Sequence, residues 1–252
     1  MPQPQQYPSR KVFIGHFTGH FDGHGAIAAD TILRIQNKYP GKVIAVNIHS
    51  GFFSRPFPPT YTTDLRCNEG DEYFKFLNIA YNPVGVVNWI GYPYDILKDY
   101  WGEWGSLTDS LISLPPEVDI RITNNFNSGT RMLNSSVCCK FLNSFNGTYK
   151  LTLLLTEDSI VASQKDYSKP PPHITPNYAH PNVLRDGITT SWGDTLKMGP
   201  IVKGDSIIKN YSYTLPLNFN GINPNENHCK VVAYIYDASN YQVIQAEEGK
   251  IK

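Results

Sequence analysis

The sequence has few charged residues and no excess of either sign. Asp, Glu, Lys and Arg together make up 17% of the 252 residues, and 22 basic residues balance 22 acidic ones. A surface that follows nucleic-acid phosphates normally leaves a basic excess, so we expect no nucleic-acid partner. No apolar run approaches the roughly 18–20 residues of a membrane-spanning helix, so we expect any membrane attachment to be through an N-terminal lipid anchor.

Cysteine is scarce as well. The chain contains no C-x-x-C pair and no zinc-type spacing among its four cysteines, Cys67, Cys138, Cys139 and Cys229. Cys138 and Cys139 are neighbours in a strand-like run, so their side chains should face opposite sides of a sheet. This arrangement favours buried or idle thiols, and it leaves open a disulfide from either of the two to Cys229.

Aromatic residues, proline and glycine are plentiful. There are 16 Tyr, 12 Phe and 4 Trp, with 19 Pro and 19 Gly, a mixture typical of a β-rich, loop-rich, exported protein. The polar start "MPQPQQYPSR" predicts a flexible N-terminal segment over residues 1–10, of the kind left after an export signal has been removed.

Residues 11–115 have the pattern of an α/β domain. A short strand at 11–17 precedes an amphipathic helix at 26–39, and a largely apolar strand at 42–49 follows, which together predict a βαβ unit. Two more helices and a third strand, introduced by Pro83, complete this segment, and Pro115-Pro116 is a credible boundary.

Residues 116–252 have a different pattern, of short alternating or apolar runs separated by Asn, Gly and Pro turns. This pattern predicts an antiparallel, Ig-like β-sandwich. The irregular stretch 163–194 is too long for a simple connection, so we expect it to be functional or to be ordered by packing. The predicted fold class is therefore α+β, with two domains.

The chain resembles the twenty-eight-kilodalton outer-membrane-protein-related family of Gram-negative envelope proteins, many of which are lipoproteins. The similar stretches include "KVFIGHFTGH", "VIAVNIHSGFF", "NPVGVVNW", "KLTLLLTEDSIVASQKDY" and "HPNVLRDGITTSWGD", in that order. The resemblance implies a thioredoxin-like domain over 11–115 followed by the β-sandwich over 116–252. It also implies a location in the cell envelope, either associated with the outer membrane or periplasmic.

The resemblance further implies a redox motif that this chain has lost. The family usually carries C-x-x-C at the start of the first helix, where the helix N-terminus lowers the pKa of a thiol. Here "TGHFDGHGA" places Asp22 and Gly25 at the two cysteine positions, with Gly23 and His24 between them. Pro83 matches the cis-proline that faces such a motif. Without a thiolate we expect no thiol–disulfide activity and no enzyme.

Histidines offer a metal-binding alternative. His16, His20 and His24 are spaced four residues apart around Asp22, and His49 ends the second predicted strand. These ligands could hold zinc or copper. Neighbouring glycines predict a loop, however, and on a loop the regular spacing has no geometric meaning. We therefore expect the histidine rings to form hydrogen bonds with backbone groups or solvent, and Asp22 to cap the helix. We expect no cofactor, and a bound divalent metal is the alternative.

Two aromatic stretches, "GFFSRPFPP" and "YDILKDYWGEWG", could stack on sugars or anchor a protein partner. We favour packing between the two domains, or over the edge of a small sheet, as their role. Asp186 and other acids near the predicted strand ends lack the calcium-loop pattern. The leading hypothesis is a non-catalytic envelope protein with a binding or surface-assembly role and an envelope protein or a glycan as its partner. Carbohydrate binding through the aromatic loops is a further alternative.

Overall fold

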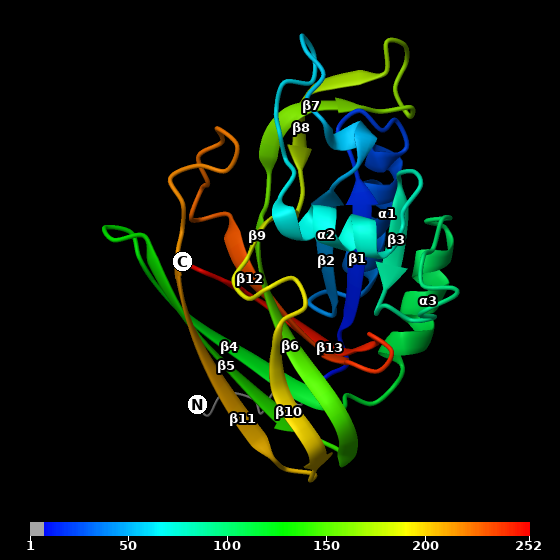
Figure 1. Ribbon diagram of the computed structural model, residues 1–252. Coiled ribbons are helices and arrows are strands. Elements are labelled where there is room, and N and C mark those ends of the chain that lie inside the picture. Colours follow the sequence, from blue (N-terminus) through cyan, green and yellow to red (C-terminus); the bar gives the residue numbers. More distant parts are fainter. Residues whose placement is uncertain (1–7) are drawn as a thin grey trace, which may run out of the picture.

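The computed structural model describes residues 8–252, in which thirteen strands and three α-helices are present (Figure 1). Residues 1–7 of the predicted flexible segment 1–10 lie outside this description. None of the helices in residues 8–252 combines the length and the apolar character that crossing a membrane requires.

The N-terminal elements are β1 (Val12–Thr18), α1 (Gly25–Lys38), β2 (Val43–His49), a 3-10 turn η1 (Phe52–Ser54), α2 (Asn68–Phe76), β3 (Val84–Val87) and α3 (Glu103–Ile112). The strands that follow are β4 (Val118–Asn127), β5 (Met132–Phe141), β6 (Phe145–Glu157), β7 (Ile160–Lys165), β8 (Ile174–His180), β9 (Val183–Gly187), β10 (Asp194–Ile201), β11 (Ser206–Thr214), β12 (Cys229–Asp237) and β13 (Val243–Lys250).

One mixed sheet runs through both halves of the chain, in the order β13-β12-β6-β9-β2-β1-β3, with β10 paired to β6. β1 and β2 are parallel, whereas β1–β3 and β6–β12 are antiparallel. The link between the halves is β9, which pairs with β6 on one edge and meets β2 through Asn47 and Val183 on the other. A three-stranded sheet β11-β5-β4 and the hairpin β7–β8 complete the fold, at opposite ends of Figure 1.

The two faces of the mixed sheet are covered differently. One face carries a continuous apolar core that extends from Phe13 and Ile44 to Val232 and Tyr234, so it includes residues from both predicted domains. On the other face, α1 and α3 cover β1 and β2 around the fully buried Trp104. Further along that face, β6 and β12 pack against the three-stranded sheet.

The predicted fold class, a thioredoxin-like α/β domain joined to an Ig-like β-sandwich, is therefore wrong. The chain is mostly β, and its largest sheet is shared between the two predicted segments. The physical reason is that periodicity identifies a strand but not its neighbours: β2 is buried along its whole length, and it gains part of its surroundings from β9, over 130 residues away in sequence. Whether 11–115 and 116–252 are separate folding units stays a prediction.

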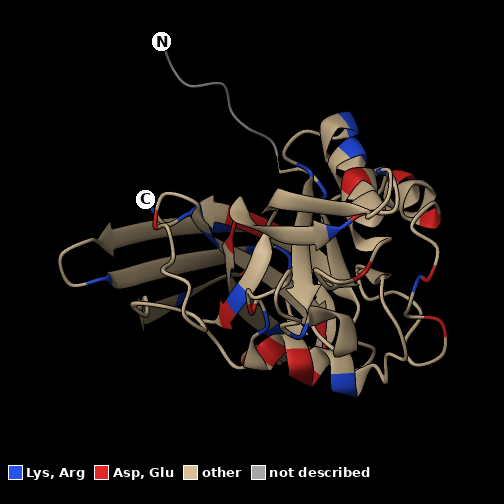
Figure 2. Ribbon diagram, turned by 90° about the horizontal axis from the view of Figure 1, so that it is seen from above, with Lys and Arg blue, Asp and Glu red and all other residues tan. Residues whose placement is uncertain are grey.

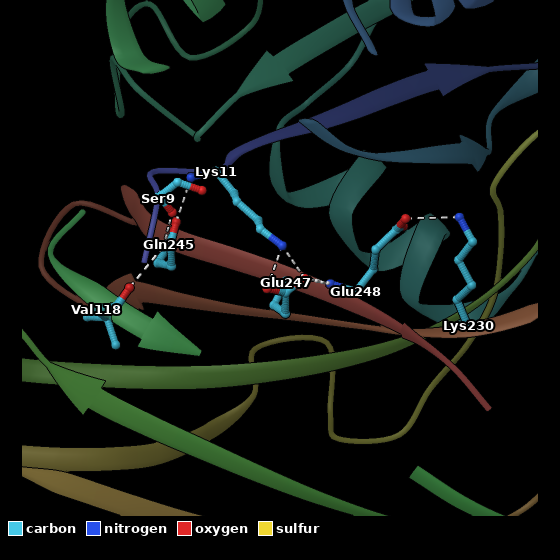
Figure 3. A network of polar contacts seen from close by, with 7 residues as sticks. All are labelled: Ser9, Lys11, Val118, Lys230, Gln245, Glu247 and Glu248. Atoms are coloured by element: carbon cyan, nitrogen blue, oxygen red, sulfur yellow. Dashed lines mark hydrogen bonds and ion pairs between the residues drawn. The ribbon is translucent and has the colours of Figure 1, made fainter. Parts of the chain in front are cut away.

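Polar contacts also hold the two segments together (Figure 3). The buried side chain of Gln245 accepts a hydrogen bond from the Lys11 N–H at 2.8 Å and donates to the carbonyls of Ser9 and Val118, each at 2.9 Å. Lys11 also forms an ion pair with Glu247. A single amide of β13 thus satisfies backbone groups at the start of the chain and at the start of β4.

Candidate functional site

The turn between β1 and α1 contains the positions at which the resemblance places the lost cysteines. The Asp22 side chain accepts a hydrogen bond from the His24 N–H at 3.0 Å, and the Asp22 carbonyl accepts one from Gly25 at 3.3 Å. Burial raises the pKa of Asp22, and the bond from His24 opposes that shift. Asp22 therefore stabilises the turn that leads into α1, while His24, the N-cap residue, makes no cap bond with its own side chain.

The segment after β7 covers this turn. The Tyr167 N–H donates to the Gly23 carbonyl at 2.9 Å, and a Cβ atom on Gly23 would lie 2.5 Å from the Tyr167 ring. The Gln164 amide donates to the Asp22 carbonyl at 2.9 Å. Residues 163–194, predicted to be functional or ordered by packing, thus include β8, β9 and the segment that closes over the start of α1.

Three buried histidines line a small cavity beside the same turn. His16 of β1, His49 at the end of β2 and His180 at the end of β8 are each at most 2% exposed. The parallel register pairs Thr18 with His49 and His16 with Asn47, which places the first two imidazoles on one face of adjacent strands. We call this cavity the histidine chamber. Its volume is about 10 Å³, the space of roughly one water molecule.

Each of these imidazoles has one ring nitrogen without a hydrogen-bond partner among residues 8–252: His16 Nε2, His49 Nδ1 and His180 Nε2. His16 Nδ1 lies 2.6 Å from Asn47 Oδ1, and the amide nitrogen of Asn47 donates to the Pro181 carbonyl at 2.6 Å. Because the Asn47 oxygen can only accept, His16 Nδ1 carries the proton, and Nε2 presents a lone pair.

Burial makes these histidines poor bases. It lowers the pKa of His16 to about 4 and that of His180 to about 3. The pKa of His49 lies well below its usual value through burial and through repulsion from the neighbouring His180. All three rings are therefore neutral near pH 7, which is the form that binds a metal or accepts a hydrogen bond.

The other two predicted histidines lie outside the chamber lining. His20 is buried, stacks on Tyr61 with ring centroids 5.5 Å apart, and has its Nε2 3.0 Å from the Arg55 carbonyl. His24 is exposed and meets the Tyr167 ring edge-on. Within residues 8–252, no group of three or more His, Cys, Asp or Glu is placed to hold a metal ion. The even spacing of His16, His20 and His24 thus does not build one site.

His180 is the residue that sequence reasoning missed. It is the last residue of β8, in a segment without a metal motif. Only the packing of the β7–β8 hairpin on the end of β2 brings it to 5.2 Å from His49 between ring centroids. A groove of about 290 Å³ lies next to the chamber, between α1 and the turn after β8. The groove and the chamber share four lining residues: Ala29, Asn47, Tyr178 and Pro181.

Pro83 precedes β3, and the Asn82–Pro83 peptide bond is cis, as the resemblance implies. Pro83 is not among the residues that line the chamber. The four cysteines are free thiols, so the disulfide left open from sequence is not formed. Burial raises the pKa of the Cys67 thiol far above its usual value, and it raises that of Cys139 and Cys229 to about 12.

The two aromatic stretches are only partly buried. Trp104 is fully buried and donates to the Lys98 carbonyl at 3.2 Å. By contrast, four of the rings are exposed, so the prediction that they fill an interdomain interface is wrong for Phe52 (64% exposed), Phe57 (57%), Tyr94 (97%) and Tyr100 (63%). A different aromatic cluster, which includes Tyr73, Trp89, Trp192 and Tyr241, packs between α2 and the mixed sheet.

A family model described as outer membrane protein Omp28 matches residues 71–252. Among solved structures, HBP35 of Porphyromonas gingivalis has a TM-score of 0.72 at 14% identity, over 96% of this chain and 76% of that one. Protein AGR_C_4864 from Agrobacterium tumefaciens has a TM-score of 0.57 at 13% identity, over 98% and 97% of the two chains. These two structures are similar in fold alone. No curated protein matches the chain.

Proposed function

Because this chain belongs to the Omp28 family of outer membrane proteins, we propose that it is a non-enzymatic binding protein without thiol–disulfide activity. The protein belongs to the Gram-negative cell envelope and is associated with the outer membrane. Its binding role and the absence of redox activity are the proposal. The absence of redox activity rests on the turn before α1, and the binding role rests on exposed aromatic rings.

The observation that carries the proposal is the closure of this turn by Tyr167. Thiol–disulfide exchange needs an accessible thiolate. The sequence has no thiol at Asp22 or Gly25, and the Tyr167 ring packs on Gly23 between these positions. A substrate could not approach a sulfur atom there without displacing Tyr167.

Insulin reduction in the presence of dithiothreitol tests the absence of redox activity. We expect the protein to give no rate above that of dithiothreitol alone, and turnover by the wild type would contradict the proposal. A double variant, Asp22→Cys with Gly25→Cys, restores the C-x-x-C spacing and tests the effect of the closure. With Tyr167 in place it should stay slow, and adding Tyr167→Ala should increase its rate if closure of the turn is what protects it.

The exposed aromatics support the binding role. The rings of Phe57 and Tyr94 are exposed and could contact a partner. Figure 2 shows acidic and basic residues interspersed over the molecule, without a large region of one charge. Such surfaces bind by stacking and apolar contact, which suits a glycan of the envelope. A glycan array should give a signal that Phe57→Ala and Tyr94→Ala weaken. Leu217→Ala, an exposed apolar control, should leave it unchanged. A protein as the partner is the alternative outcome if no glycan binds.

Metal binding at the histidine chamber is a second candidate, favoured by its three unpartnered imidazole nitrogens. The hydrogen bond from His16 to Asn47 is of the kind that orients a metal-ligating histidine. The rings are not placed to hold a metal in this structure, so they would have to turn. Elemental analysis of tag-free protein should then find a stoichiometric metal that His49→Ala and His180→Ala lose and that the exposed control His24→Ala keeps. Metal-free wild type would remove this candidate.

A further inference from the structure

A larger cleft lies away from the histidine chamber, between the start of α2, the end of β9 and the loop that contains Phe219. Its volume is about 350 Å³, within the range of small-molecule sites. Arg185 and Asp71 both line it. We call it the arginine cleft.

Arg185 has hydrogen-bonding capacity that the protein does not use. Its side chain is 1% exposed, and its guanidinium lies 4.8 Å from the centroid of the Phe219 ring. Arg185 Nε is 3.3 Å from Glu157 Oε2, but neither Nε nor Nη2 has a hydrogen-bond partner in the described part of the chain. A buried arginine normally meets a carboxylate through two parallel hydrogen bonds, so the Arg185 guanidinium beside the cleft lacks hydrogen bonds that its burial calls for.

The remaining charges of the cleft are mostly engaged. Arg66 holds Asp64 through two hydrogen bonds of 2.9 and 2.7 Å. Asp186 accepts from the Tyr213 hydroxyl. Asp71 is exposed and has no ion-pair partner among the described residues.

The balance of charge selects the kind of ligand. Two basic residues and three acidic ones line the cleft, which leaves one net negative charge. A polyanion such as phosphate would be drawn to Arg185 but repelled by the wall as a whole. A ligand that carries both a carboxylate and an ammonium group suits both Arg185 and Asp71.

We propose that the arginine cleft binds a small zwitterion of the amino-acid or short-peptide class. Its carboxylate accepts hydrogen bonds from Arg185, and its ammonium group faces Asp71. This inference rests on the proposed binding role and adds to it a ligand class and a place. It is independent of the exposed aromatics and of the histidine chamber.

Calorimetric titration of the full chain with a set of Ala-Xaa dipeptides tests the inference. We expect at least one dipeptide to bind and to lose tenfold or more in affinity when its C-terminus is amidated or when Arg185→Lys is introduced. N-acetylation of the peptide and Asp71→Asn should each weaken binding, and Asp71→Asn should have no further effect on the acetylated peptide. The matched control is Glu72→Gln, which removes the same charge from α2 outside the cleft lining.

Failure of every dipeptide to bind would overturn the inference, as would binding of inorganic phosphate alone or an equal loss in Glu72→Gln. If circular dichroism shows that Arg185→Lys does not fold, the comparison of Asp71→Asn with peptide acetylation decides the question by itself. Insulin reduction by the wild type would contradict the proposed non-redox role without changing these titrations. Failure of the proposed function and failure of this inference are therefore distinguishable.

Discussion

The histidine chamber and the arginine cleft bury nitrogen-rich side chains in opposite ways. A histidine can give up its proton, and burial lowers the pKa of His16 to about 4. The chamber therefore contains neutral imidazole rings. Burial also lowers the pKa of Arg185, but a guanidinium stays protonated at any ordinary pH. The histidines of the chamber are therefore neutral, whereas Arg185 keeps its charge, which Glu157 balances at 3.3 Å. The two hollows should differ in how they respond to mutation, to acid and to ligands.

The largest expected effect comes from removing the charge at the cleft. Arg185→Ala leaves Glu157 buried without its partner, which should lower the free energy of unfolding by about 3–5 kcal/mol. Urea denaturation at pH 7 measures this change. The double variant Arg185→Met with Glu157→Leu should recover much of the loss, because it removes both buried charges together. A loss in Arg185→Ala below about 1 kcal/mol would mean that the pair is effectively solvated.

Acid should affect the chamber. The folded-state pKa of His180 is about 3 and its ordinary value is 6.5, so between these values the unfolded chain takes up a proton that the folded chain does not. Stability therefore falls as the pH decreases, by about 1.4 kcal/mol per pH unit for each such histidine. Urea denaturation at pH 7 and pH 4.5 should show that His180→Gln loses about 2–3 kcal/mol less than the wild type. Equal losses would mean that His180 is not buried as a neutral ring.

Asn47 connects His16 of the chamber to Pro181, in the turn between β8 and β9. Asn47→Ala removes the acceptor for His16 Nδ1 and the donor to the Pro181 carbonyl, which should lower the free energy of unfolding by about 1–3 kcal/mol. Nitrogen NMR should show His16 with its proton on Nδ1 in the wild type and a mixture of tautomers in the variant. A wild-type His16 protonated on Nε2 would contradict the arrangement of the chamber.

The smallest effects are expected at the exposed residues next to each hollow. His24→Ala and Asp71→Asn should each change the free energy of unfolding by less than about 0.5 kcal/mol, because neither side chain is buried. Thermal unfolding of the two variants measures this. A larger loss in His24→Ala would mean that His24 supports the chamber through its contact with Tyr167.

Local sequence signals located many elements but not their partners. The predicted helix at 26–39 and strand at 42–49 lie within one residue of α1 and β2, because apolar periodicity reports which face of an element is buried. The fold class failed because β9 joins strands from both predicted domains, and a five-residue strand carries no signal for a parallel neighbour.

The candidate site shows the same limit. His16 could be singled out from sequence by its spacing from His20 and His24, and His49 because it ends a predicted strand. The parallel register of β1 and β2 then brings these two residues together. His180 could not be singled out, because only the fold of the β7–β8 hairpin carries it to the end of β2. Arg185 had no signal either: burial and missing hydrogen bonds, rather than a motif, distinguish it from the other arginines.

The hydrogen bonds of the Gln245 amide constrain the order in which the fold can form. It joins the backbone at Ser9, Lys11 and Val118, and β12 and β13 complete the edge of the mixed sheet. A chain that emerges N-terminus first leaves the outer edge of β2 unpaired until β9 has followed, and it leaves these three backbone groups unbonded until residue 245 has followed. Contacts over such sequence separations form slowly and expose strand edges in the meantime. The N-terminal strands therefore reach their final surroundings only after nearly the whole chain has followed them.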